Sequence, residues 1–410
     1  MLSFGGPAGQ IALMHRVLVD EHKWISEARF LHALNFCLLL PGPEAQQLAT
    51  YVGWLMHGAP GGLLAGGLFI LPGFVAIMAL SLFYAAWGAT PAASGVFFGL
   101  KAAALAIVAA AVWRMGGRTL KTFPQRLLAC LAFAAIFLFD VPFPALIVGA
   151  GLIGFFRAAH FTPPPSSLPE TPDEAGTARA SSLQPAAICA LLWLTPVAVL
   201  SGRFGPGDVY AQIALFFSKT ALMTFGGAYA ALAYVAQQAV ERFHWLSAPE
   251  MLDGLGMAET TPGPLILVLQ FVGFMAAFRH PGDLPPLVAG ALGGALATWV
   301  TFAPCFLWIF AGAPLVERLR GVQALTAALS AIAAAVVGVI ANLAVWFAIH
   351  FLFHDRWSPT PGLELPVIAS LDPAALLLSG AIAAALWRTA GLPAALAIGA
   401  VGGIVLRGPG

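Results

Sequence analysis

Three long stretches of this sequence carry no charged side chain, and they restrict the fold more than any other feature. They run from residue 45 to 100, from 284 to 316 and from 321 to 354. A helix that crosses a membrane needs about 20 consecutive apolar residues, so each stretch is long enough for at least one. Soluble domains carry about 25% charged residues, whereas this chain has 9%. The sequence therefore predicts an all-α polytopic membrane protein, surrounded by the lipid bilayer.

The apolar segments form two groups, separated by a polar interval. We expect about 10 to 13 membrane segments in total, some of them broken or half-length. The interval, residues 160–185, is rich in Pro and Ser and contains four charged residues. Such a composition is typical of a flexible linker outside the bilayer. We therefore divide the chain into an N-terminal repeat (1–159), this linker (160–185) and a C-terminal repeat (186–410).

The two groups of segments have similar sequences. Placing Phe4 on Phe225 aligns two Phe-Gly-Gly motifs and, without a gap, the two Pro-Gly-Pro motifs that begin at Pro41 and Pro262. Twelve of the 41 positions from residue 3 to 43 are identical at this offset. Further along the chain, Pro72 aligns with Pro304 and Lys101 with Ala333. Internal repeats of this kind are common in transporters.

The basic residues indicate that the two repeats have opposite orientations. The loop from residue 114 to 126 contains four Lys or Arg residues, whereas its counterpart from 354 to 366 contains only Arg356. The difference is reversed at Arg318 and Arg320, whose counterpart loop near residue 90 has no basic residue. Because cytoplasmic loops are the basic ones, equivalent loops should lie on opposite sides of the membrane. We therefore predict an inverted repeat.

Both motifs fall inside or at the edge of apolar segments, where they should break helices. Proline removes a backbone donor and glycine weakens the helix. A broken helix exposes N–H groups that attract anions, and unpaired backbone is tolerated in a membrane only where it lines a cavity. The alternative is that these glycines only allow close helix packing, but the repetition and the Pro-Gly-Pro motif favour an anion site. The residues predicted to bind the anion are Phe4, Gly5, Gly6, Pro41, Gly42, Pro43, Phe225, Gly226, Gly227, Pro262, Gly263 and Pro264.

Two lysines lie deep in apolar segments, where a charge is costly and usually faces a cavity. Lys101 and Lys219 are therefore predicted to bind the anion, although a lysine can also extend its stem to the membrane surface. Glu44 directly follows the first Pro-Gly-Pro motif, and Glu259 stands three residues before the second. Each of these carboxylates could carry a coupling proton, or could simply pair with Lys101 or Lys219.

Other classes of function have little support in the sequence. The net charge is +1 and no basic stripe is present, so a nucleic-acid partner is not expected. The scattered cysteines and histidines show no metal-binding pattern, and we expect neither a metal nor another cofactor. A membrane-embedded enzyme would need a nucleophile and a base, which the apolar segments do not offer.

Trp24 and Trp245 precede Ser26 and Ser247. We interpret the two serines as helix N-caps and the two tryptophans as side chains at the membrane interface.

At these motifs the sequence resembles the bacterial chromate ion transporters, in the form that has two homologous halves. The resemblance covers nearly the whole chain and rests on five blocks: Ser3–Pro7, Trp24–Glu27, Leu40–Leu48, Leu222–Tyr229 and Ala258–Pro264. It implies a secondary transporter of the bacterial inner membrane that exports chromate, a tetrahedral oxyanion, and confers chromate resistance. The implied driving force is the proton gradient or the membrane potential. A homodimer is a further expectation.

The chain departs from the family pattern at its start. Family members usually have more chain before the first Phe-Gly-Gly, so Lys219 has no counterpart here and the first repeat is expected to be truncated. Nothing in the spacing distinguishes chromate from sulfate, and a carrier of sulfate or another oxyanion remains the main alternative. A passive anion channel is less favoured, because an inverted repeat suits alternating access.

Overall fold

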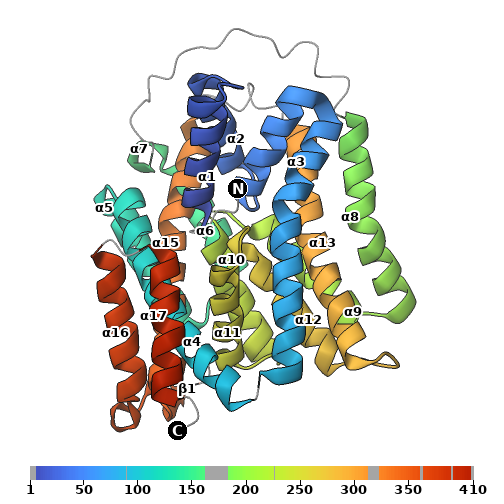
Figure 1. Ribbon diagram of the computed structural model, residues 1–410. Coiled ribbons are helices and arrows are strands. Elements are labelled where there is room, and N and C mark those ends of the chain that lie inside the picture. The colour runs from blue at the N-terminus through green and yellow to red at the C-terminus, as the bar shows by residue number, and fades with distance from the viewer. Residues whose placement is uncertain are drawn as a thin grey trace. The chain divides into compact units, whose positions relative to one another are not determined.

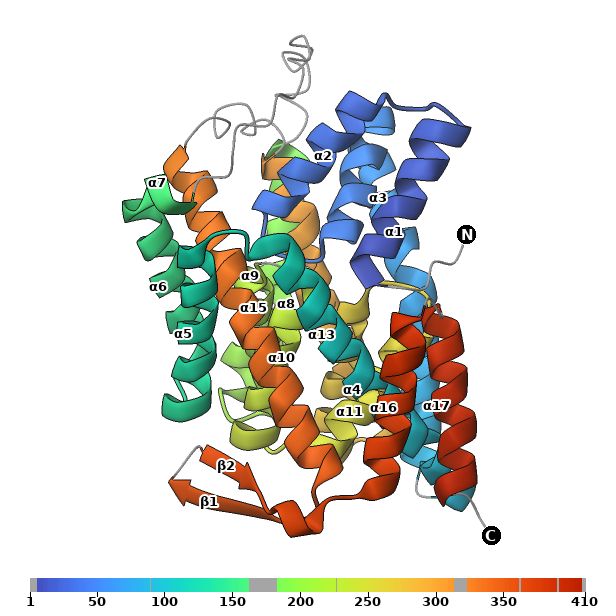
Figure 2. The same ribbon diagram turned by 90° about the vertical axis from the view of Figure 1, so that its left-hand side faces the viewer.

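The computed structural model describes residues 6–88, 90–161, 183–225, 227–312, 323–360, 363–388 and 391–407. Helices dominate these residues, which confirms the predicted all-α class (Figure 1). A single described hairpin, β1 (Arg356–Thr360) paired with β2 (Leu363–Pro366), follows α15 (Figure 2). Phe4, Gly5, Gly226, Arg318, Arg320 and most of the predicted linker lie outside the described residues.

The helices of the first half are α1 (Gly6–His15), η1 (Arg16–Glu21), α2 (Glu27–Leu39), α3 (Glu44–Trp87), α4 (Pro91–Thr119), α5 (Phe123–Phe139), α6 (Phe143–Phe156) and α7 (Ala158–Phe161). Those of the second half are α8 (Leu183–Phe204), α9 (Val209–Met223), α10 (Ala228–Gln237), η2 (Gln238–Arg242), α11 (Ala248–Thr260), η3 (Leu265–Leu267), α12 (Val268–Arg279), α13 (Pro286–Gly312), α15 (Gln323–Leu352), η5 (Ile368–Ser370), α16 (Pro373–Trp387) and α17 (Leu392–Arg407).

Several helices carry the length and apolar surface that a bilayer requires. In the described part of the chain, α3, α4, α8, α13 and α15 are long and apolar enough to cross a membrane, and six further apolar helices are shorter. The most apolar windows of α3 and α8 are only 17% buried, so most of their apolar side chains remain exposed. Such continuous exposed apolar surface is expected where lipid replaces water. The chain is therefore a multi-pass membrane protein.

The chain forms two compact units, and each unit contains segments from both halves of the sequence. Unit 1 comprises residues 1–79, 164–231 and 261–322, and unit 2 comprises residues 80–163, 232–260 and 323–410. The division into repeats, 1–159 and 186–410 on either side of 160–185, concerns sequence similarity rather than packing, and its boundaries stay a prediction.

The backbone repeats at the spacing found in the sequence. Helices α2 and α11 occupy equivalent residues, and each follows a π-helical turn, η1 or η2. Lys23 and its equivalent His244 both have a positive φ, of 53° and 51°, and Gly42 and Gly263 have φ values of 127° and 125°. Positive φ is rare outside glycine, so its recurrence at the aligned Lys23 and His244 is strong evidence for two copies of one fold, and the aligned glycines agree with it.

The N-caps of α2 and α11 are confirmed, but one tryptophan prediction is wrong. The Ser26 hydroxyl accepts a hydrogen bond from the Arg29 amide, and the Ser247 hydroxyl accepts one from the Glu250 amide. Trp24 is 58% exposed, as an interfacial side chain should be, whereas Trp245 is only 2% exposed. The difference arises because α11 is buried along most of its length while α2 is not.

Helix α3 is a hairpin of two helical arms. Its 44 residues would span roughly twice the thickness of the hydrocarbon core if they were straight. The backbone leaves the helical region at His57 and Gly58, and the chain reverses there (Figure 1). A Cβ on Gly53 would lie 2.5 Å from the Gly61 carbonyl oxygen, so the arms meet at these glycines. The apolar stretches 45–57 and 60–88 of the sequence form these two arms.

Helices α12 and α13 form the equivalent hairpin in the second half. The contact between its arms is also made by two glycines, because a Cβ on Gly273 would lie 2.8 Å from the Gly293 carbonyl oxygen. In unit 1 the second arm of α3 packs against α13. Gly62 contacts Phe310 at one end of this pair, and Gly294 contacts Met78 at the other.

These two contacts are equivalent to each other. The alignment that places Pro72 on Pro304 also places Gly62 on Gly294 and Met78 on Phe310. The equivalent helices therefore run antiparallel and exchange equivalent contacts. In unit 2, the equivalent helices α4 and α15 also run antiparallel, because Phe98 contacts Phe351 and Gly116 contacts Val337. Antiparallel pairing of equivalent helices confirms the inverted repeat.

Candidate functional site

Each Pro-Gly-Pro motif is a turn between two helices of the repeat. The first turn joins α2 to α3, and the second joins α11 to η3 and α12. Both central glycines have φ values near +126°, a conformation that a side chain would strain. Proline on either side prevents a continuous helix. The sequence therefore dictates a helix break at both places, as predicted.

Each turn packs against the proline-containing segment of the opposite repeat. A Cβ on Gly42 would lie 2.9 Å from the Cys305 sulfur, and a Cβ on Gly263 would lie 3.2 Å from the Gly73 Cα. Cys305 and Gly73 are equivalent residues, because each directly follows one of the aligned prolines, Pro304 and Pro72. Unit 1 therefore contains both predicted turns, each packed against a proline-containing helix of the other repeat.

Hydrogen bonds connect the turns to other segments of unit 1. The Gly42 N–H donates to the Thr224 carbonyl at 2.8 Å, which ties the first turn to the residue before Phe225. The Gln10 amide donates to the Gly263 carbonyl at 2.5 Å, and the Gln47 amide donates to the Pro41 carbonyl at 2.7 Å. Glutamine side chains thus satisfy backbone groups that the turns leave without a helical partner.

Four glutamines make this region polar although it is buried. Their Oε1 atoms have no hydrogen-bond partner among the described residues, and each side chain is nearly or fully buried: Gln10, Gln46, Gln47 and Gln270. Buried polar atoms normally have a partner, so these amides have unused capacity for a ligand or for water. The sequence analysis missed them, although a polar residue in an apolar segment was the available signal.

The second Phe-Gly-Gly motif lies between α9, which ends at Met223, and α10, which begins at Ala228. Gly227 has a φ of 102°, and a Cβ there would meet no atom within 4 Å. Of the first motif, only Gly6 lies in the described part of the chain, as the first residue of α1. All four motifs therefore directly precede the start of a helix in unit 1, where free N–H groups carry partial positive charge.

The predicted charged residues fall in both units. Lys219 is exposed on α9, five residues before Thr224, and Glu44 is the first residue of α3. Lys101 lies on α4 in unit 2, and Glu259 is buried on α11 in unit 2. The two glutamates therefore lie in different units.

Lys101 has a partner that the sequence analysis did not identify. Its ammonium lies 3.4 Å from Asp253 Oδ1, and Asp253 Oδ2 accepts a hydrogen bond from the Tyr84 hydroxyl at 3.0 Å. Lys101 is 19% exposed and Asp253 5%, so the pair is largely buried. Lys101 pairs with neither Glu44 nor Glu259, the two partners that the sequence suggested. Asp253 lies outside the long charge-free stretches of the sequence, so its position alone gives no sign of an intramembrane partner.

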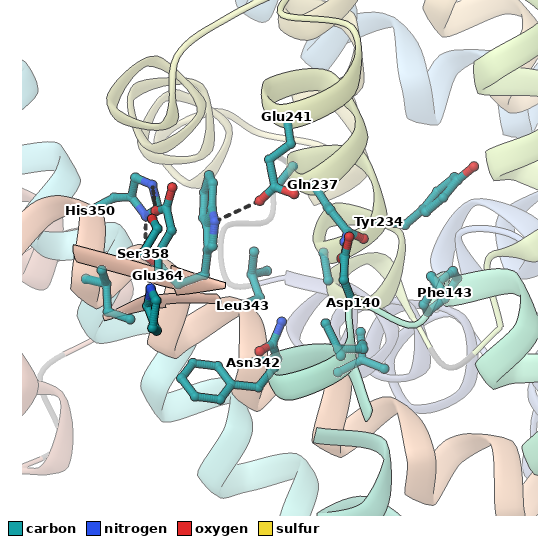
Figure 3. Close-up of a pocket in the computed structure, with 18 residues that line it drawn as sticks. Asp140, Phe143, Tyr234, Gln237, Glu241, Asn342, Leu343, His350, Ser358 and Glu364 are labelled. Atoms are coloured by element: carbon teal, nitrogen blue, oxygen red, sulfur yellow. Dashed lines mark hydrogen bonds and ion pairs between the residues drawn. The ribbon is translucent and has the colours of Figure 1, made fainter. Parts of the chain in front are cut away.

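A cavity of about 580 Å³ in unit 2 is lined by three carboxylates, Asp140, Glu241 and Glu364 (Figure 3). Asp140 accepts a hydrogen bond from Gln237, and Glu241 accepts one from the Trp346 indole at 3.1 Å. Burial and the charges of Asp140 and Glu364 raise the pKa of Glu241 to about 7, although the bond from Trp346 lowers it. Carboxylates that already repel one another would repel an anion. This cavity is therefore unsuited to a dianion.

Comparison with known proteins gives a consistent result. The profile of the chromate transporter family matches residues 1–155 and 211–405. A chromate transport protein of Cupriavidus metallidurans is 29% identical over 352 residues, which are 85% of this chain and 79% of that protein. A chromate transport protein of Pseudomonas aeruginosa is 33% identical over 349 residues, which are 83% of this chain and 76% of that protein.

A third relative matches only part of the chain. An uncharacterized transporter of Bacillus subtilis is 27% identical over 121 residues, which are 30% of this chain but 68% of that protein. No solved structure matches this sequence. The family profile matches two separate regions, one on each side of the predicted linker, as two repeats require. The chain belongs to the chromate transporter family.

Proposed function

We propose that this protein is a secondary transporter that exports chromate across the bacterial inner membrane and thereby confers chromate resistance. Relatives named chromate transport proteins support the substrate. The antiparallel pairing of equivalent helices supports alternating access, because inverted repeats can exchange inward-facing and outward-facing arrangements. Its family membership also favours transport over catalysis.

The observation that carries the proposal is that unit 1 contains both Pro-Gly-Pro turns, each packed against a proline-containing helix of the other repeat. Each turn is followed by a helix start. Free N–H groups at helix starts bind oxyanions without a fully charged partner. We place the substrate at these turns and at the segment from Thr224 to Gly227. Lys219 would supply positive charge on the adjacent helix.

Glu44 is the proposed coupling residue of this site, with Glu259 as the second candidate. Glu44 directly follows Pro43 and begins α3. An ionised carboxylate at that position competes with a dianion for the same N–H groups, whereas a protonated one does not. Binding of the oxyanion would therefore favour proton uptake by Glu44.

Replacement of Lys219 tests the proposal. Lys219→Ala should lower chromate uptake into inverted membrane vesicles about 10- to 100-fold, the usual loss for one charge-assisted contact. Lys121→Ala, which removes a lysine between α4 and α5, should retain uptake. Equal expression of both variants in the membrane would be measured by immunoblot. Wild-type uptake by Lys219→Ala would exclude this lysine from the site.

The alternatives differ in substrate and in energy coupling. If sulfate is the substrate, labelled sulfate should enter the vesicles and chromate should compete only weakly. If the protein is a passive channel, uptake should persist after an uncoupler collapses the proton gradient. For the proposed carrier, chromate should compete strongly with labelled sulfate, and the uncoupler should stop chromate uptake.

A further inference from the structure

The buried charge pair of unit 2 has a geometry that is unusual for a purely structural ion pair. Asp253 Oδ1 lies 3.4 Å from the Lys101 ammonium but makes no hydrogen bond to any described residue. A tight Lys–carboxylate hydrogen bond is shorter, about 2.7–2.9 Å. Tyr84 holds the other oxygen, Oδ2, at 3.0 Å. The carboxylate is thus anchored by one oxygen, and the oxygen that faces the ammonium is free to take a proton.

The packing keeps this arrangement away from solvent. Gly256, on the same helix as Asp253, lies against Leu100, because a Cβ there would lie 2.9 Å from the Leu100 Cβ. Phe97 packs edge-on against Tyr84 at 4.9 Å between ring centres. A buried pair of this kind is costly to break by removing one partner, because the remaining charge has no compensation. If an anion takes the place of Asp253 beside the Lys101 ammonium, the Asp253 carboxylate must therefore be neutralised.

Few other charged groups can take part. On α11 itself, Glu250 lies about one turn before Asp253 and acts on it through its charge, and the buried Glu259 lies less than two turns after it. Helix α4 also carries Arg114 and Arg118, more than three turns beyond Lys101. Helix α15, which also packs against α11, carries His350 near its end. In the described structure, Lys101 and Tyr84 are the groups in direct polar contact with the Asp253 carboxylate.

We propose that Lys101, Asp253 and Tyr84 form a proton-gated binding position for the transported oxyanion. The oxyanion replaces Asp253 as the partner of the Lys101 ammonium, and Asp253 takes up one proton from water at Oδ1 as the anion binds. When the anion leaves, the proton returns to water and the carboxylate pairs with Lys101 again. The inference rests on the proposed function, and it assigns a role to Asp253 and Tyr84 that the motifs of unit 1 do not.

The charge balance explains why the exchange is coupled. With Asp253 ionised, one ammonium would face both a carboxylate and a dianion, which repel each other in a medium of low dielectric. Protonation removes one of these negative charges and leaves Lys101 to the oxyanion. At this position one proton is bound with each anion, so the affinity of this position for the anion should fall about tenfold for each pH unit above the midpoint of proton uptake by Asp253.

The test measures chromate binding to the purified full-length protein in detergent, from about pH 6 to about pH 9. Wild type and variants are compared at the same pH, so that the protonation of chromate itself cancels. Asp253→Asn mimics the protonated carboxyl, so it should lack the loss of chromate affinity that wild type shows as the pH rises. Its affinity relative to wild type should therefore increase with pH. At about pH 9 it should bind at least 10-fold more tightly than wild type. Lys101→Gln should bind at least 10-fold more weakly at low pH.

Two further variants keep the test decisive. Tyr84→Phe removes only the hydroxyl that stabilises the ionised carboxylate, so the midpoint of the pH profile should move to higher pH. This variant decides the question if Asp253→Asn does not fold. Glu250→Gln removes a nearby negative charge and retains the capping interaction with Ser247. It should therefore move the midpoint slightly to lower pH, opposite to the shift in Tyr84→Phe.

The outcomes separate this inference from the proposed function. A wild-type pH slope that survives unchanged in Asp253→Asn, or an unshifted profile in Tyr84→Phe, would overturn the inference alone. Failure of the wild-type protein to bind chromate at any pH would overturn the proposed function, and this inference with it.

Discussion

Gly42 and Gly263 show how single residues fix the proposed site. Their positive φ values place the turn, and the absence of a side chain lets Cys305 and Gly73 approach. Both requirements are visible in the sequence as Pro-Gly-Pro, because the conformation is local. The unsatisfied glutamines and Asp253 could not be predicted in the same way, since their roles depend on which distant segments come together.

Gly42→Ala should damage the fold and the site together. The new Cβ would be strained by the backbone and would lie 2.8 Å from Gln47 Nε2 and 2.9 Å from Cys305 Sγ. Strain and overpacking together should cost about 2–4 kcal/mol, seen as a lower melting temperature in detergent. Gly67→Ala is the matched control, because its Cβ meets no atom within 4 Å. Equal melting temperatures for the two variants would contradict the described turn.

Glu241 should make the stability of the protein depend on pH. Its pKa in the folded protein is about 7, above the ordinary value of 4.5, because of burial first and then the charge of Asp140. The folded state therefore binds this proton more tightly than the unfolded state. The stabilisation is complete below about pH 4.5 and is lost as the pH rises through about 7.

Glu241→Gln should remove this dependence. At about pH 8 the variant should be about 1–2 kcal/mol more stable than wild type after allowance for solvent screening, whereas near pH 5 the two should be similar. Thermal unfolding at both pH values measures the difference. A constant difference between the two proteins across this range would show that Glu241 titrates normally.

At the scale of helices and hairpins, hydropathy predicted most segments but not their environment. The apolar segments 45–57 and 60–88 correspond to the arms of α3, and the break at His57 and Gly58 separates them. Burial was less predictable, as the aligned Trp24 and Trp245 show. Both precede an N-cap, yet only Trp24 is exposed, because sequence similarity fixes the local backbone and not the surrounding helices.

The glycine contacts of the two hairpins give a prediction at this scale. Gly53→Val and Gly273→Val should each prevent their arms from meeting, because the added side chains would strike the carbonyl groups of Gly61 and Gly293. Each should cost at least 2–3 kcal/mol and lower the yield of monodisperse protein in size-exclusion chromatography. Gly67→Val, on the open side of α3, should retain a normal yield. Strong damage from only one of the two hairpin variants would show that the hairpins are not equivalent.

At the scale of the whole molecule, the aligned motifs predicted the repeat and the basic loops predicted its inversion. The positive-inside rule uses only the loops, and the antiparallel pairs α3 with α13 and α4 with α15 agree with it. The two compact units were not predicted, since each combines segments from both repeats. Packing partners that are far apart in the sequence leave no simple periodic pattern.

Membrane topology can be tested with two single cysteines. In a protein whose four native cysteines are replaced by alanine, Thr119→Cys marks the end of α4 and Ser358→Cys marks the hairpin after α15. An impermeant maleimide should label Thr119→Cys only in inside-out vesicles and Ser358→Cys only in right-side-out vesicles. Labelling of both cysteines from the same side would contradict the inverted arrangement.

The exchange of contacts between the Pro-Gly-Pro turns and the opposite prolines also limits how the two copies can evolve. Each repeat supplies the residue against which the turn of the other repeat packs. A larger side chain at position 73 or 305 would therefore displace the turn of the other repeat. A larger residue at either position would therefore require a compensating change in the other repeat. The small residues Gly73 and Cys305 couple the sequences of the two repeats to each other.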